Sequence, residues 1–145
     1  MLWAALLCLA AAISGCDSGE RMLSVDGEGL EPAGRVLLVN YWAEWCAPCR
    51  EEIPALNTLA QSAETVLVVG INYDALPAEQ TRTQMEKLGI VFPVLVEEPP
   101  YRWGQPRPDI LPSTFVIDPD GQWRETLVGP QTLEQLKAAV ERSRL

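Results

Sequence analysis

Two cysteines placed where a strand gives way to a helix constrain this chain more than any other feature. Cys46 and Cys49 are separated by Ala47 and Pro48 in the stretch "VNYWAEWCAPCREEIP". The apolar run "RVLLVNYW" leads into them and predicts a strand that is buried on both faces. After them, apolar residues recur at helical spacing and predict a helix: Ile53, Leu56, Leu59, Ala60 and Ala63.

The remaining pattern predicts one α/β domain with the order β-α-β-α-β-β-α. Further strands are expected at 65–72, 113–118 and 122–128, an additional extended stretch at 91–97, and helices at 77–89 and 132–145, the last with a capping box of Thr132 and Gln135. The stretch "MLSVDG" is expected to add a short edge strand, and the Pro-rich segment 98–108 a surface loop. This order predicts a mixed central sheet flanked by helices on both faces.

Four kinds of site can use a Cys-x-x-Cys pair, and the sequence separates them. A c-type haem site needs histidine directly after the second cysteine, where this chain has Arg50. A structural zinc site needs four ligands, and the chain has no histidine to join the two thiolates. A structural disulfide is the main alternative, although so short a loop constrains the unfolded chain little. Redox catalysis is the interpretation that we favour, and no cofactor or metal is expected.

The local physics assigns different roles to the two thiols. Pro48 suits the first turn of a helix, which places Cys46 at the helix N-terminus. Unpaired backbone N–H groups and the helix dipole stabilise a thiolate there. Cys49 lies one turn further on, within disulfide reach but more buried. We therefore expect Cys46 to attack and Cys49 to resolve the mixed disulfide.

The stretch "NYWAEWCAPCREEIP" resembles the active site of thioredoxin-fold oxidoreductases, and more narrowly their exported TlpA/ResA/DsbE branch. "GINYD" and "LPSTFVID" also resemble segments of that branch, so that the likeness covers about residues 35–130. The resemblance implies the thioredoxin fold and a cis peptide bond before Pro112. It also implies reduction of disulfides in exported proteins, often those of cytochrome c maturation, with Trp45 and Leu111 beside the substrate.

Proton transfer during exchange needs a further group. Thioredoxins proper carry a buried aspartate at the position of Asn40, and an amide cannot take up a proton. Asp74 and Glu52 are the candidate proton acceptors, and the resemblance supports a carboxylate near Asp74. The alternative that both are solvated surface acids stays open.

The N-terminus predicts export and anchoring. Residues 1–15 are apolar and uncharged and are typical of a signal segment. "ISGC" resembles a bacterial lipobox, which makes Cys16 the lipidated residue, and Asp17 resembles an inner-membrane retention signal. Residues 16–34 are expected to form an acidic tether and residues 35–145 the thioredoxin-like domain.

Charge and compartment narrow the partners. The net charge of −9 disfavours nucleic acid and anionic lipid as ligands. We expect a lipid-anchored thiol–disulfide oxidoreductase on the periplasmic face of the inner membrane, supplied by a membrane electron donor and acting on exported proteins. A disulfide oxidase and a non-catalytic binding or chaperone module remain as alternatives.

Overall fold

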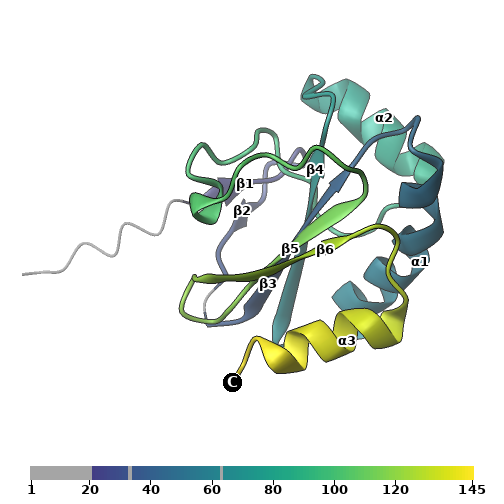
Figure 1. Ribbon diagram of the computed structural model, residues 1–145. Coiled ribbons are helices and arrows are strands. Elements are labelled where there is room, and N and C mark those ends of the chain that lie inside the picture. Colours follow the sequence, from purple (N-terminus) through teal and green to yellow (C-terminus); the bar gives the residue numbers. More distant parts are fainter. Residues whose placement is uncertain (1–20, 33, 63) are drawn as a thin grey trace, which may run out of the picture.

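The computed structural model describes residues 21–32, 34–62 and 64–145 (Figure 1). The predicted signal segment, Cys16 and the start of the predicted tether lie outside these residues. The main strands are β3 (Val36–Trp42), β4 (Val66–Asn72), β5 (Ser113–Ile117) and β6 (Trp123–Val128). The helices are α1 (Ala47–Ser62), α2 (Ala78–Leu88) and α3 (Leu133–Arg142), so the predicted helices and these four strands are confirmed.

The strands form one mixed sheet in the order β4-β3-β5-β6. β3 pairs parallel with β4 and antiparallel with β5, and it is buried along its whole length. The extended stretch expected at 91–97 makes two isolated bridges, one joining Val94 to Gly70 and one joining Leu95 to Ser24. Because β3 is an inner strand, its C-terminal end places the cysteine pair near the middle of one end of the sheet.

The two faces of the sheet are covered differently. Buried apolar residues of all three α-helices belong to a single cluster that contains Leu38 and Trp42 of β3. The other face, with Leu37 and Val39, packs against the β1–β2 hairpin and the single-turn 3₁₀ helix η1 (Arg102–Gly104). Figure 1 shows the α-helices to the right of and below the sheet, and β1, β2 and η1 to its left. The predicted thioredoxin fold is confirmed, and the second face is covered by this hairpin and short turn in place of an α-helix.

The folded domain begins before the predicted boundary at residue 35. β1 (Met22–Leu23) pairs antiparallel with β2 (Gly29–Leu30), and Met22 and Leu30 are each 6% exposed. Val25 is also buried, and its N–H donates to the carbonyl of Val94. The described part of the predicted tether is therefore a hairpin packed on the core, which corrects the assignment of residues 21–32 to a linker.

The Pro-rich segment 98–108 is fastened to the sheet by polar contacts. The hydroxyl of Tyr41 donates to Glu98 at 2.9 Å, and Glu98 pairs with Arg107 at 3.3 Å. The Arg107 guanidinium lies 4.0 Å from the ring centroid of Tyr73, whose hydroxyl donates to the Pro108 carbonyl. These contacts hold the segment in place although its prolines exclude an α-helix.

Within the described residues, no helix is both long and apolar enough to cross a bilayer.

Candidate active site

Cys46 and Cys49 form a disulfide at the N-terminus of α1. Their Cα atoms are 5.3 Å apart, and the backbone N–H of Cys49 donates to the Cys46 sulfur at 3.2 Å. Cys46 directly precedes the first helical residue, as the position of Pro48 predicts. Cys46 is 4% exposed and Cys49 1%, so neither sulfur is freely accessible in this state and Cys49 is the more buried. An N–H already directed at Cys46 is suited to stabilising a thiolate there.

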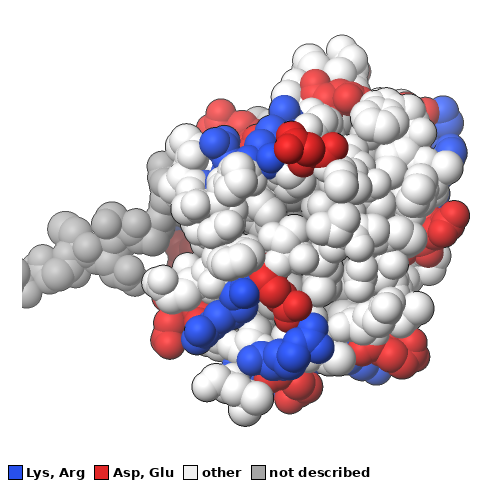
Figure 2. Space-filling view, viewed as in Figure 1, with Lys and Arg blue, Asp and Glu red and all other residues white. Residues whose placement is uncertain are grey.

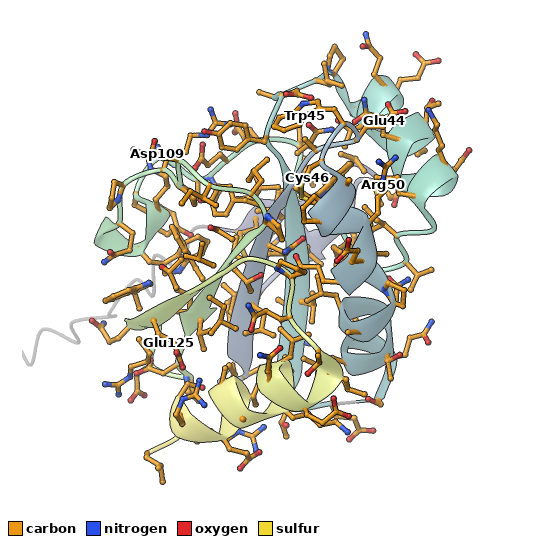
Figure 3. The ribbon with its side chains drawn as sticks, turned by 45° about the vertical axis from the view of Figure 1, so that its right-hand side comes forward. Glu44, Trp45, Cys46, Arg50, Asp109 and Glu125 are labelled. Carbon is orange, nitrogen blue, oxygen red and sulfur yellow. A yellow bond between two sulfur atoms is a disulfide. The ribbon has the colours of Figure 1, made fainter. Side chains whose placement is uncertain are left out.

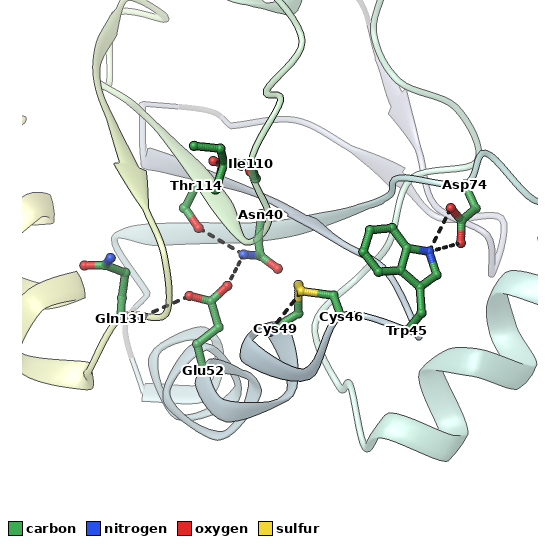
Figure 4. The surroundings of a disulfide bond; sticks show 10 residues. Asn40, Trp45, Cys46, Cys49, Glu52, Asp74, Ile110, Thr114 and Gln131 are labelled. Carbon is green, nitrogen blue, oxygen red and sulfur yellow. Dashed lines mark hydrogen bonds between the residues drawn. A yellow bond between two sulfur atoms is a disulfide. The ribbon is translucent and has the colours of Figure 1, made fainter.

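Glu52 lies one helical turn after Cys49 and is 1% exposed (Figure 4). Its carboxylate accepts a hydrogen bond from Asn40 Nδ2 at 2.5 Å and one from the backbone N–H of Gln131 at 3.1 Å. Burial raises the pKa of Glu52 to about 7, although the bonds from Asn40 and Gln131 oppose the shift. Glu52 is thus a buried acid on the same helix face as the resolving cysteine, and not a solvated surface group.

Asp74 occupies a different environment. It is exposed, and the indole N–H of Trp45 donates to its two carboxylate oxygens at 3.1 and 3.0 Å. Trp45 itself is 64% exposed. Asp74 thereby orients the indole at the rim of the site, while Glu52 lies beneath the disulfide. The structure separates the two predicted carboxylates, and only Glu52 is buried.

Acidic and basic side chains near the disulfide partly offset each other's charge. Figure 3 places Glu44, Trp45 and Arg50 around Cys46, with Asp109 at the same end of the molecule. Glu44 forms an ion pair with Lys87, and the hydrogen bond from Lys87 lowers the pKa of Glu44. Because this carboxylate is paired, it opposes a Cys46 thiolate less than its place in the sequence suggests.

The loop before β5 carries the predicted cis-proline. The peptide bond between Leu111 and Pro112 is cis, which confirms the expectation from the family resemblance. Pro112 is buried, and its carbonyl accepts a hydrogen bond from the N–H of Gly129, so this carbonyl already has a partner within the chain. Leu111 is half-buried and packs against both apolar clusters.

Two exposed apolar side chains near this loop were not predicted from the sequence. Ile110 is 60% exposed and Val128 is 54% exposed, and both line a groove that also contains Phe115 and Thr126. Val128 pairs with Ser113, the residue that follows the cis-proline. Ile110 and Val128 lie near each other because β5 pairs with β6, and no local sequence signal could have revealed this proximity.

The names of known relatives describe thiol–disulfide chemistry. The chain is 31% identical over 113 residues to "Thiol-disulfide oxidoreductase ResA" of Bacillus thuringiensis, which covers 75% of this chain and 64% of the relative. It is 31% identical over 112 residues to "Thiol:disulfide interchange protein HelX" of Rhodobacter capsulatus, covering 74% of this chain and 60% of the relative. The chain thus spans less than two thirds of the length of these relatives.

Solved structures share the fold. StoA from Bacillus subtilis matches with a TM-score of 0.68 at 22% identity, covering 82% of this chain and 93% of that one. A thiol:disulfide interchange protein of the thioredoxin family from Chlorobium tepidum matches with a TM-score of 0.64 at 24% identity, covering 85% and 91%.

The family is shown by a match that extends well beyond the cysteine pair. The model of the AhpC/TSA family matches residues 25–126, which run from the β1–β2 hairpin through the cis-proline loop into β6. The chain therefore belongs to the AhpC/TSA family.

Proposed function

We propose that this protein is a thiol–disulfide oxidoreductase that reduces disulfides of exported proteins by dithiol exchange at Cys46 and Cys49. The observation that carries the proposal is the buried disulfide at the N-terminus of α1, with a backbone N–H directed at Cys46. The names of the relatives ResA and HelX support the same chemistry.

The exchange proceeds in two steps. The Cys46 thiolate attacks one sulfur of the client disulfide, a Cys46–client bond forms, and the other client sulfur leaves as a thiolate. Cys49 then loses its proton and attacks the Cys46 sulfur, so the Cys46–Cys49 disulfide forms and the second client thiolate leaves. The client gains two electrons and the protein loses two, which a dithiol electron donor in the membrane must restore.

Glu52 is the proton acceptor that we assign to the second step. It shares the buried face of α1 with Cys49, whereas the carboxylate of Asp74 is occupied by the Trp45 indole at the surface. A carboxyl group with a pKa of about 7 is ionised often enough near neutral pH to take up a thiol proton. The sequence named both Asp74 and Glu52 as candidates, with the resemblance supporting a carboxylate near Asp74, whereas burial favours Glu52.

Client segments are expected to bind across the cis-proline loop. Trp45 presents an exposed apolar side chain beside the disulfide, and Ile110 and Val128 present exposed apolar side chains in the groove next to the loop that carries Leu111 and Pro112. An extended peptide can combine contacts to such side chains with backbone hydrogen bonds. Nucleic acid is not an expected partner, because the net charge is −9 and Figure 2 shows basic groups beside acidic ones at the margin of a broad uncharged area.

The reduction potential of the Cys46–Cys49 pair tests the direction of exchange. Ala47 and Pro48 offer the Cys46 thiolate neither a charge nor a side-chain hydrogen bond, so the thiolate is expected to be only moderately stabilised. We expect a value closer to that of thioredoxin, on the order of −270 mV, than to that of a strong disulfide oxidant, about −120 mV. Equilibration with glutathione or dithiothreitol measures it. A potential above about −150 mV overturns the reductase assignment in favour of a disulfide oxidase.

Anchoring through Cys16 completes the proposal and has its own test. Lipidation at Cys16 would place the domain on the periplasmic face of the inner membrane, close to a membrane electron donor and to substrates such as those of cytochrome c maturation. Cys16→Ser is expected to abolish acylation and to impair processing, as judged by fatty-acid labelling and the size of the mature protein. Wild-type protein that remains in the membrane fraction without acylation contradicts the lipid anchor.

A further inference from the structure

A buried oxygen atom beside the disulfide has no hydrogen-bond donor. Asn40, on β3, is 1% exposed, and its Oδ1 has no partner among the described residues. Most buried polar atoms in proteins have a partner, because leaving one unpaired costs free energy. An unpaired acceptor at the centre of the site therefore calls for a donor that is missing in the disulfide state.

The orientation of this amide is fixed by its nitrogen. Asn40 Nδ2 donates to Glu52 Oε1 at 2.5 Å and to Thr114 Oγ1 at 3.0 Å, so both of its hydrogens are used. Rotating the amide by half a turn would bring its oxygen against the Glu52 carboxylate, which is also an acceptor whenever it is ionised. Asn40 Oδ1 is thus held in its present direction while Glu52 is ionised.

That direction is toward the cysteine pair. Asn40 lies on the same face of β3 as Leu38 and Trp42, whose side chains belong to the cluster that contains Cys46 and Cys49. Glu52, the partner of Asn40, lies one turn from Cys49 on the buried face of α1. Figure 4 shows the Asn40 oxygen facing the disulfide sulfurs. A disulfide carries no hydrogen, so it cannot satisfy this acceptor.

We propose that Asn40 is a positioning residue whose Oδ1 accepts a hydrogen bond from the Cys49 thiol whenever Cys49 is reduced. Two electrons and two protons convert the disulfide into two thiols, and the reduction itself creates the missing donor. The same bond forms in the mixed disulfide, where Cys46 is bound to the client and Cys49 keeps its hydrogen. It holds the Cys49 sulfur beside Cys46 for the resolving attack, and in this respect the inference rests on the proposed dithiol exchange.

The proposal predicts that Asn40 favours the dithiol form. Asn40→Leu keeps a similar volume and removes the acceptor, so the equilibrium constant for reduction by glutathione is expected to fall about three- to tenfold. A tenfold fall corresponds to a potential about 30 mV more negative. Asn57→Leu is the matched control, because in the described part of the chain the Asn57 side chain bonds only to the backbone of Gly89 and Val91. Its potential is expected to equal that of the wild type.

A second comparison separates the action of Asn40 on Cys49 from its action through Glu52. The shift caused by Asn40→Leu is expected to persist when Glu52 is replaced by Gln in both proteins. Its disappearance in that background overturns the proposal, because the effect would then pass through the carboxylate. An unchanged potential in the single variant overturns it as well.

A measurement on the wild-type protein covers the case in which Asn40→Leu does not fold. The side-chain carbonyl carbon of Asn40 is expected to shift in the NMR spectrum when the disulfide is reduced, while that of Asn57 stays unchanged. An Asn40 signal that is the same in both redox states refutes the hydrogen bond. Failure of the wild type to exchange with glutathione at all refutes the proposed function, whereas normal exchange with an unaltered Asn40 signal refutes only this inference.

Discussion

Cys49→Ala is expected to accumulate covalent mixed disulfides with client proteins, whereas Cys46→Ala is expected to accumulate none. The first variant keeps the thiol at the N-terminus of α1 but loses the thiol that releases the client. The second loses the sulfur toward which the Cys49 N–H is directed. Turnover of a disulfide substrate should fall on the order of 10³-fold or more in both, because Cys46→Ala has lost its nucleophile and Cys49→Ala cannot release the client.

The measurement is thiol trapping followed by non-reducing electrophoresis. Adducts that disappear on treatment with dithiothreitol identify the mixed disulfides, and the Cys46→Ala/Cys49→Ala double variant gives the background. Equal trapping by the two single variants, or trapping by neither, contradicts the assignment of Cys46 as the attacking thiol. Trapping by neither, together with retained client binding, favours a non-catalytic binding module.

The elements around the cysteines could be predicted because their signals are local. β3 is a continuous apolar run, α1 shows helical spacing directly after Cys49, and Thr132 and Gln135 form the predicted capping box at α3. Each signal lies within a few residues of sequence. The cis bond before Pro112 was predicted as well, but from family resemblance and not from local physics.

The errors lie where short segments depend on distant partners. β1 and β2 have two residues each, which is too short for a periodic pattern. The stretch "MLSVDG" indicated a short edge strand, but its pairing with Gly29–Leu30 was not predicted, and residues 21–32 were assigned to a tether. The segment 91–97 has the composition of a strand but makes only isolated bridges. The central sheet nevertheless has the predicted mixed topology, because its four strands are long enough to be recognised from the sequence.

The candidate site shows the same division between local and distant information. The sequence places Glu52 three residues after Cys49, which puts both on one helix face. Whether that face is buried depends on Asn40 and Gln131, which lie 12 and 79 residues from Glu52 in the chain. Sequence reasoning could therefore name Glu52 as a candidate acid, but its burial and its raised pKa required the fold.

Glu52 is expected to make the protein less stable as the pH rises from about 4.5 to about 7. Below 4.5 the carboxyl is protonated in both the folded and the unfolded chain. Between these values the unfolded chain releases the proton while the folded protein keeps it, because burial raises the pKa of Glu52 from 4.5 to about 7. The shift corresponds to a loss of about 3 kcal/mol in the free energy of unfolding, complete above pH 7.

Glu52→Gln removes this titration, so its free energy of unfolding should fall by about 3 kcal/mol less than that of the wild type between pH 4.5 and pH 8. Urea unfolding of the oxidised proteins at the two pH values measures the difference, and it cancels any constant cost of placing the Gln amide opposite the Gln131 N–H. Glu51→Gln is the matched control, since Glu51 is the exposed neighbour on α1 and should leave the pH dependence unchanged within about 0.5 kcal/mol.

Identical pH dependence in the wild type and Glu52→Gln would mean that Glu52 ionises at its ordinary pKa. A carboxyl of that kind would be fully ionised near neutral pH and a weak base toward the Cys49 thiol. The same stability experiment therefore tests the proton acceptor that the exchange requires.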